Sequence, residues 1–341
     1  MKKNRSIQSL RALAFLGIFL CHVGTKVAWA ELGVSIFFVI SGFLLSNRDL
    51  KFNPSIKNNA LFSFKKIMKL YPLHIITMFA VLMLYLSFDM DKGELLRDTV
   101  LNILLIQCWY PSSDVNVSLN GVAWFLSAIS FLYFMYPWLN RWLKNVSEKV
   151  KMLVPIAVLA IQILACIPVY ILDGENSLYV WFMYCFPVFR LGDFIVGLIL
   201  GEWYKEEKVS VLKKNSAITV IVGILLTAGF LFWMKKTSDS MLLIVLKNWT
   251  SLNILFAAMW VLIFVSCTVP RILDNRVLQF MGDISSYIFL IHFVVIKYWR
   301  HLGLNLPFYA TIGIEMVISV ILSCLWKWAD EKIYSFRREM K

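Results

Sequence analysis

The apolar stretch from Ser9 to Gly24, SLRALAFLGIFLCHVG, carries an arginine near one end and a histidine near the other. In an α-helix, the eleven residues from Arg11 to His22 complete three turns and about 20° more, so both side chains project from one face. The rise between them is about 16 Å, roughly half the thickness of the hydrocarbon core of a bilayer. A cation near one membrane surface and an imidazole at mid-depth on the same face indicate two contact points along one ligand.

The composition of the whole chain is that of a lipid-embedded protein. Of its 341 residues, 60% are hydrophobic and only 16% are charged, against about 25% charged in a typical soluble chain. The net charge of +13 lies in short loops between apolar runs, which is the positive-inside pattern rather than a nucleic-acid-binding face. The six cysteines and four histidines are widely separated, so we expect no metal site.

The hydropathy pattern predicts an all-α polytopic membrane protein with about ten transmembrane helices in a single domain covering residues 1–341. The predicted spans lie near 7–26, 32–47, 70–88, 121–140, 152–172, 179–201, 216–234, 251–269, 280–298 and 307–328. The stretch 95–110 carries Arg97, Asp98, Asn102 and Gln107, and we expect it to be interfacial or re-entrant. With that segment not crossing, the inner loops hold 24 Lys and Arg against 7 in the outer loops. This bias predicts that both termini are cytoplasmic.

Ionisable residues inside a bilayer are costly and are usually paired or functional. Arg11 is suited to a phosphate-bearing ligand because its planar fork binds oxyanions in two places; the alternative is that it reaches lipid phosphates. His22 is suited to act as a general base, and its alternative is a hydrogen bond to a neighbouring helix. Their common face favours a functional role for both.

Four further ionisable residues lie in apolar segments. Arg190 and Asp193 stand at i and i+3, so they can pair on one helix face, either as structure or against a ligand. His292 has interhelical hydrogen bonding as its structural alternative. Glu315 could be a counter-ion for an intramembrane cation or face a cavity.

The segment 120–139 opens with Asn120 and places Trp124 at the predicted outer interface. Aromatic residues are common at that depth. The same residues could form a sugar-stacking surface beside Asp114.

Six motifs together resemble the membrane-bound acyltransferase 3 family, whose members O-acylate bacterial surface glycans. The motifs, in family order, are QSLRALAFLGIFLCH (8–22), GVSIFFVISGFLLS (33–46), FKKIMKLYPLH (64–74), AWFLSAISFLYFMYP (123–137), FPVFRLGDFIVGLILG (186–201) and MGDISSYIFLIHFVVI (281–296). The R-x10-H spacing of the first matches Arg11 and His22.

Three positions depart from the family pattern. Gln8 stands where an Asp is usual, and Lys69 replaces an Arg before Pro72, which keeps the charge and loses the bidentate fork. Ile129 occupies a position at which many members have Glu, so a catalytic carboxylate from that motif cannot be transferred to this chain. We expect acyl transfer to finish within the membrane domain or on a partner protein.

The resemblance implies an O-acetyltransferase of the bacterial cytoplasmic membrane, with acetyl-CoA as donor and a surface polysaccharide or lipid-linked glycan as acceptor. Arg11, with Lys65, Lys66 and Lys69, would hold the CoA phosphates, and the pantetheine arm would run along the first helix to His22. His22 would act as general base or as acyl carrier.

Four other residues complete the predicted site. Arg190 would stabilise the developing oxyanion or the donor. Trp124, Asn120 and His292 are the predicted substrate-binding residues. No metal is expected.

Two other functions fit parts of the sequence. A transporter of glycans or lipid-linked sugars also suits ten spans with charged residues in the membrane, but it predicts inverted repeats, and the Arg11/His22 pair has no counterpart in the second half. A non-catalytic accessory subunit of glycan export gains support from the missing acid at position 129. Labelled acetyl-CoA separates these functions, because only an acyltransferase moves the label to glycan.

Overall fold

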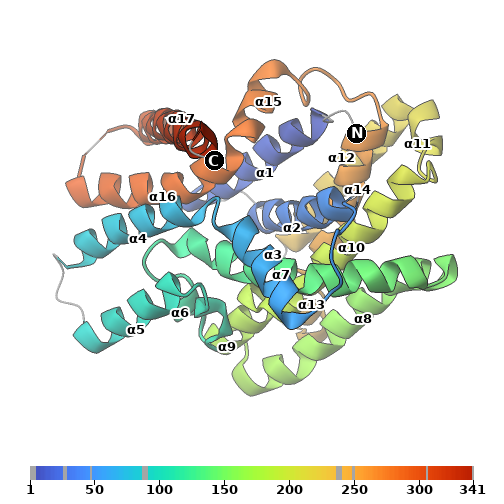
Figure 1. Ribbon diagram of the computed structural model, residues 1–341, viewed down its shortest axis with the longest axis horizontal. Helices are drawn as coiled ribbons and strands as arrows, with labels where there is room; N and C mark the ends of the chain where they lie inside the picture. Colours follow the sequence, from blue (N-terminus) through green and yellow to red (C-terminus); the bar gives the residue numbers. More distant parts are fainter. Residues whose placement is uncertain are drawn as a thin grey trace.

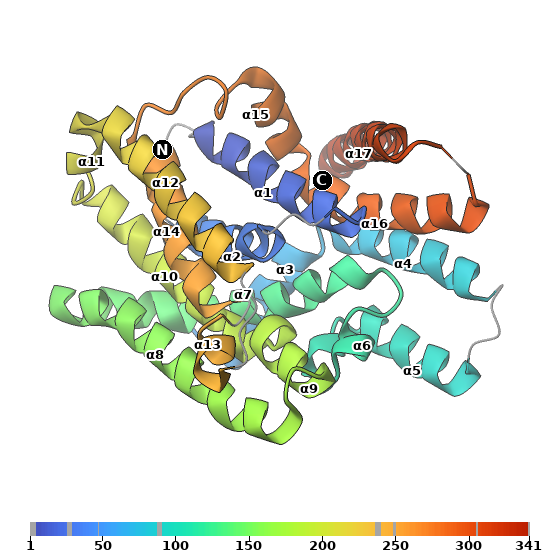
Figure 2. The same ribbon diagram turned by 180° about the vertical axis from the view of Figure 1, so that it is seen from behind.

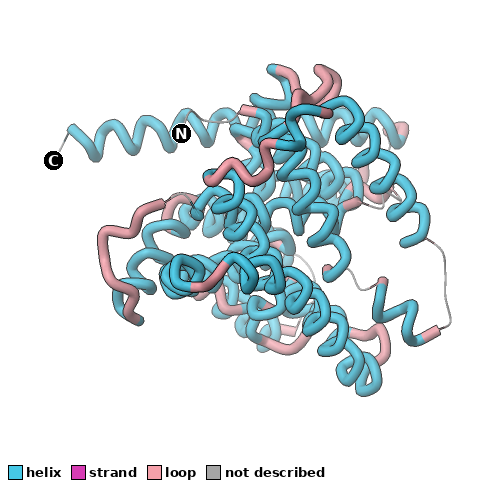
Figure 3. Tube along the Cα trace, turned by 90° about the vertical axis from the view of Figure 1, so that its right-hand side faces the viewer, coloured by secondary structure: helices cyan, strands magenta, loops and turns pink. Residues whose placement is uncertain are grey.

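The computed structural model describes residues 5–25, 29–46, 48–86, 91–235, 240–247, 250–304 and 306–339, and every regular element in these ranges is a helix (Figures 1 and 3). The first half comprises α1 (Ser6–His22), α2 (Ala30–Ser46), α3 (Ile56–Ile67), α4 (Tyr71–Tyr85), α5 (Lys92–Ile103), η1 (Gln107–Trp109), α6 (Ser113–Asn116), η2 (Gly121–Ala123), α7 (Trp124–Asn145) and α8 (Glu148–Asp173). The second half comprises α9 (Ser177–Val180), η3 (Trp181–Cys185), α10 (Pro187–Lys205), α11 (Val211–Lys214), α12 (Ser216–Met234), α13 (Met241–Leu246), α14 (Ser251–Ser266), α15 (Arg276–Asp283), α16 (Ser285–Leu302) and α17 (Phe308–Glu339).

Several of these helices are long and apolar enough to cross a membrane. Six described segments qualify alone: Gly121–Asn145, Glu148–Asp173, Ser177–Lys205, Ser216–Met234, Leu243–Ser266 and Phe308–Ile333. Two bent pairs, α3 with α4 and α15 with α16, raise the number to eight if each pair is one span. The chain is therefore an all-helical, multi-pass membrane protein.

The finer points of the predicted topology stay predictions. Helices α1 and α2 are apolar but shorter, at 17 residues each, so the count of ten spans is not established. The same holds for the cytoplasmic location of the termini and for the single domain. The predicted span ends at 26, 47 and 87–88 lie outside the described residues.

The predicted inner loop at 48–69 contains a helix that the hydropathy pattern did not reveal. Helix α3 begins after Ser55, whose hydroxyl accepts a hydrogen bond from the Asn58 N–H at 3.2 Å. Its lysines lower the mean hydropathy, so an amphipathic helix here resembles a polar loop. The 95–110 stretch is helical through Ile103 and then turns at η1; its position in the membrane remains a prediction.

Helices α2 and α10 lie side by side at the centre of the molecule and pack through glycines (Figure 2). A Cβ on Gly42 would lie 2.2 Å from the Phe194 carbonyl oxygen, and one on Gly197 would lie 2.1 Å from that of Val39. The glycines therefore let the two backbones come into direct contact. In a membrane such backbone contact is a main source of helix association.

Helix α1 is held against α15, which lies beside it in Figure 2. A Cβ on Gly282 would lie 1.9 Å from the Gln8 carbonyl oxygen, so only glycine permits this approach. Asp274, in the loop before α15, accepts hydrogen bonds from the hydroxyls of Ser6 (2.5 Å) and Ser9 (2.6 Å). These contacts fix the end of α1 that carries Arg11.

Candidate active site

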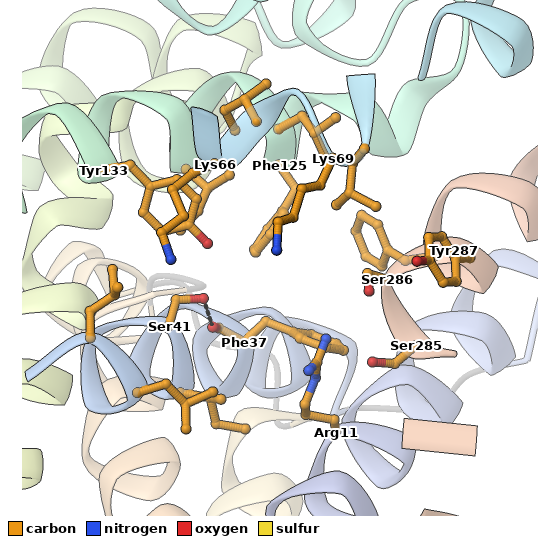
Figure 4. Close-up of a pocket in the computed structure, with 18 of the residues that line it drawn as sticks. Arg11, Phe37, Ser41, Lys66, Lys69, Phe125, Tyr133, Ser285, Ser286 and Tyr287 are labelled. Atoms are coloured by element: carbon orange, nitrogen blue, oxygen red, sulfur yellow. Dashed lines mark hydrogen bonds between the residues drawn. The ribbon is translucent and has the colours of Figure 1, made fainter. Parts of the chain in front are cut away.

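A cavity of about 330 Å³ lies where the two bent helix pairs approach α1, α2 and α7 (Figure 4). The α3–α4 pair bends by 62° and the α15–α16 pair by 76°. Lys66 and Lys69 reach into the cavity from the first bend, and Ser285 and Ser286 border it at the second. Arg11 enters from the opposite side, on α1 (Figure 4). Two breaks in helical regularity therefore deliver polar groups to one place.

The cavity has an excess of positive charge. Four cations line it, namely Arg11, Arg48, Lys66 and Lys69, and no Asp or Glu is among its lining residues. In the described part of the chain, no carboxylate lies within ion-pair distance of these four. A cleft lined by charges of one sign attracts ions of the opposite sign, so the arrangement is suited to a polyanionic ligand.

Arg11 itself is poised toward that ligand. Its Cζ lies 5.9 Å from the centre of the Phe37 ring, and among the described residues its Nε is buried without a hydrogen-bond partner. A guanidinium without a protein acceptor has its donor fork available for oxyanions.

The start of α16 adds to the positive potential. Residues 285–287 form its first turn and all three line the cavity. The first N–H groups of a helix have no partner within the helix and attract anions. Within the described hydrogen bonds, the N–H groups of Ser285 and Ser286 have no acceptor outside the helix.

The cavity ends at three phenylalanine rings. Phe37, Phe125 and Phe289 all line it, and their centroids are 5.4 to 6.2 Å apart. Phe289 also contacts the ring of His292, at 6.0 Å between centroids. We call these three rings the aromatic partition; among them, Phe289 both lines the cavity and contacts His292.

Beyond the partition, two histidines from opposite ends of the chain form a hydrogen bond. His22 Nδ1 lies 2.9 Å from His292 Nε2. The two ring planes differ by 16°, and the ring centroids are 5.2 Å apart. This centroid distance exceeds the distance between the two nitrogens by about two ring radii, so the nitrogens lie on the line that joins the centroids. The rings therefore meet edge to edge in nearly one plane, along the lone-pair direction, rather than stacking face to face.

His292 is fully buried. Its Nδ1 lies 3.0 Å from the carbonyl oxygen of Ile288, one turn earlier in α16. The end of α1 is fixed as well, because Arg300 Nη2 donates to the His22 carbonyl oxygen at 2.7 Å. The His292 ring is thus held by a backbone carbonyl, and the position of His22 is fixed through its own backbone carbonyl.

Arg11 and His22 do share a helix face, but that face is not an open groove. Phe15 and Phe19 occupy it between them and are completely buried. Phe15 packs edge-on against His292, with centroids 5.2 Å apart. The donor path predicted along α1 is therefore closed. Neither histidine is among the residues that line the basic cavity, and Phe289, which lines the cavity and contacts His292, lies between the two.

Arg190 and Asp193 pair as predicted, with 3.7 Å between Nε and a carboxylate oxygen. Arg190 also donates to the hydroxyls of Thr250 (2.7 Å) and Ser35 (3.3 Å), and it packs over the Phe38 ring. None of these partners lines the basic cavity. The contacts are those of a residue that joins α2, α10 and α14, and a catalytic role for Arg190 stays a prediction.

Three other predicted site residues lie apart from the cavity. Trp124 is 5% exposed and packs on Tyr184, while Asn120 is fully buried and donates to Thr77 Oγ1 and the Leu290 carbonyl oxygen. Both side chains are engaged in packing in this structure, and their binding of a sugar stays a prediction. Lys65 is exposed and does not line the cavity.

The motifs of the sequence did not identify Arg48, Tyr133 or the start of α16 as cavity residues, nor Arg300 as a partner of His22. Arg48 belongs to the basic inner loop, so its charge was a usable signal. The others depend on contacts between distant segments. In the described ranges, no group of three or more His, Cys, Asp or Glu could hold a metal ion.

Comparison with known proteins agrees with the motifs. The family model described as an acyltransferase domain (acyltransferase 3) matches residues 4–328. "Acyltransferase MdmB" of Streptomyces mycarofaciens is 24% identical over 338 residues, which cover 87% of this chain and 80% of its own. No solved structure matches the chain.

Staphylococcal proteins are a second group of relatives. "Putative O-acetyltransferase SAS0844" of Staphylococcus aureus (strain MSSA476) is 24% identical, and "Putative O-acetyltransferase SACOL0978" of strain COL is 25% identical, each over 319 residues. Both alignments cover 87% of this chain. The chain spans about half the length of these two relatives (51%).

Proposed function

Because the chain belongs to the acyltransferase 3 family, we propose that it transfers an acetyl group from acetyl-CoA to a hydroxyl of a surface polysaccharide or lipid-linked glycan. The observation that carries the proposal is the basic cavity. Arg11, Arg48, Lys66 and Lys69 line it without a carboxylate among them, and coenzyme A presents phosphates that such a cavity suits.

The donor would enter with its phosphates between Arg11 and the two lysines, close to the first turn of α16. Its pantetheine arm would then pass the aromatic partition, with the thioester leading. This path replaces the one along α1, which Phe15 and Phe19 fill. The rings would also keep water from the thioester, which favours transfer over hydrolysis.

His22 would act as the general base. As the acceptor hydroxyl oxygen bonds to the thioester carbonyl carbon, its proton passes to His22. The carbon–sulfur bond then breaks, and the leaving thiolate takes that proton to become free CoA. The products are an O-acetyl ester and CoA, so atoms and charge balance. His22 Nδ1 is engaged by His292, which leaves Nε2 for the substrate.

The test uses purified protein in vesicles with labelled acetyl-CoA on one side and glycan on the other. The proposal predicts label in the glycan that alkali releases. Movement of unlabelled glycan without acetyl transfer would indicate a transporter. Acetylation that appears only after a partner protein is added, and survives His22→Ala, would indicate an accessory subunit.

A further inference from the structure

We infer that His292 is a positioning residue that fixes His22 in the single tautomer whose Nε2 is unprotonated. The inference rests on the proposed function for its role in acyl transfer. It also has a spectroscopic test that does not need activity. It reassigns His292, which the motif analysis placed among the substrate-binding residues.

The backbone carbonyl of Ile288 can only accept a hydrogen bond. The Ile288 carbonyl oxygen lies 3.0 Å from His292 Nδ1, and a carbonyl has no hydrogen to give, so Nδ1 of His292 carries the proton. His292 is fully buried, and no described carboxylate is within ion-pair distance of it. Such an imidazole is neutral, because an unpaired charge is expensive there. Nε2 of His292 is therefore a bare acceptor.

The bare Nε2 of His292 in turn determines the tautomer of His22. Its Nδ1 lies 2.9 Å from that acceptor, nearly in the plane of both rings. Two acceptors cannot hydrogen-bond to each other, so His22 Nδ1 carries the hydrogen. A neutral His22 then has its lone pair on Nε2. No hydrogen bond in the described part of the chain uses that atom.

The two hydrogen bonds that link Ile288, His292 and His22 thus have the role of the orienting Asp in a Ser-His-Asp triad. It chooses the tautomer and accepts a hydrogen bond that strengthens when His22 takes a second proton. It does so without a negative charge at membrane depth. Phe15 and Phe289 pack against His292 and hold its ring in place.

The experiment compares His292→Gln with His292→Leu. Glutamine places an amide oxygen the same number of bonds from Cβ as histidine Nε2, so it can accept from His22, whereas leucine of similar size cannot. The proposal predicts that the glutamine variant keeps kcat within about tenfold of wild type. The leucine variant should lose about 10²- to 10³-fold in kcat, with KM for the donor within about twofold. Equal kcat values for the two variants would overturn the inference.

A second readout is histidine ¹⁵N NMR of the full-length protein in nanodiscs, with the His22 signals assigned by His22→Ala. Wild type and His292→Gln should show His22 protonated on Nδ1 and bare on Nε2, and His292→Leu should lose this single tautomer. A proton on Nε2 of wild-type His22 would overturn the inference even if the leucine variant failed to fold. If wild type transfers no acetyl group, the proposed function fails while the spectra still decide the role of His292.

Discussion

The basic cavity and the histidine pair are built on opposite principles, although α1 contributes to both. The cavity collects four cations and no carboxylate, and it is bordered by helix breaks that leave backbone donors unpaired. In the histidine pair, His292 is fully buried and both of its ring nitrogens are hydrogen-bonded, to His22 and to a backbone carbonyl, while the Nε2 atom of the half-buried His22 stays available. A site that must hold a polyanion and then transfer an acyl group out of water requires both kinds of environment. The aromatic partition keeps them apart.

The largest expected effect comes from removing the base. His22→Ala should lower acyl transfer by about 10²- to 10⁴-fold, because proton transfer from the acceptor then has no positioned partner. Transfer of labelled acetyl to glycan in vesicles measures it. His301→Ala is the matched control, since His301 is exposed at the end of α16. Wild-type rates of acyl transfer in the His22→Ala variant would contradict a role for His22 as the general base.

A smaller effect is expected at the other end of α1. Arg11→Ala should raise KM for acetyl-CoA by about 10- to 100-fold, because charge-assisted hydrogen bonds are worth about 1.5–3 kcal/mol. Arg11→Lys should have a KM for acetyl-CoA between those of wild type and Arg11→Ala, because lysine keeps the charge and loses the planar donor fork. Initial rates at varied donor concentration check this. A fall in kcat with KM unchanged would place Arg11 with the chemistry rather than with donor binding.

The partition itself is probed by Phe289→Leu, which trims the ring between cavity and histidine while leaving an apolar side chain. Water should then reach the thioester more often, and hydrolysis relative to transfer should rise by about two- to fivefold. Free CoA released with and without glycan gives the ratio. An unchanged ratio in a stably folded variant would show that this ring does not exclude water.

The smallest effect is on stability. Although partial burial would raise the pKa of Asp274, hydrogen bonds from Gln279, Ser6 and Ser9 outweigh it and hold that pKa below its ordinary value. The stabilisation is therefore complete above the unfolded-state pKa of about 3.9 and is lost as pH falls through the lower, folded-state pKa.

Asp274→Asn should accordingly reduce the free energy of unfolding at neutral pH by about 1 kcal/mol. Thermal unfolding between pH 7 and pH 3 should show a gap between wild type and variant that narrows toward acid. A stability difference between wild type and variant that widens toward acid would contradict a lowered pKa of Asp274.

Local patterns predicted an all-helical chain with several apolar helices, and they predicted some of the side-chain placements. The spacing of Arg11 and His22 placed both on one face of α1, and the i, i+3 spacing predicted the Arg190–Asp193 pair. The same periodicity could not show that Phe15 and Phe19 fill the space between, because that depends on how α16 packs.

Other failures have the same physical origin. A tryptophan packed among helices and one exposed at an interface look alike in sequence, so the burial of Trp124 could not be predicted. The hydrogen bond between His22 and His292 joins residues 270 positions apart, and it follows from tertiary packing that no local pattern encodes.

Whether the donor cavity and the histidine pair have separate roles is tested by measuring CoA binding and acyl transfer separately. CoA binding is measured by calorimetry with the protein in nanodiscs. Lys66→Ala should weaken CoA binding by about three- to tenfold. Lys65→Ala and His22→Ala should bind as wild type does, and only His22→Ala of these two should fail to transfer acetyl. Equal weakening by Lys65→Ala and Lys66→Ala, or loss of CoA binding in His22→Ala, would contradict the separation of the donor cavity from the histidine pair.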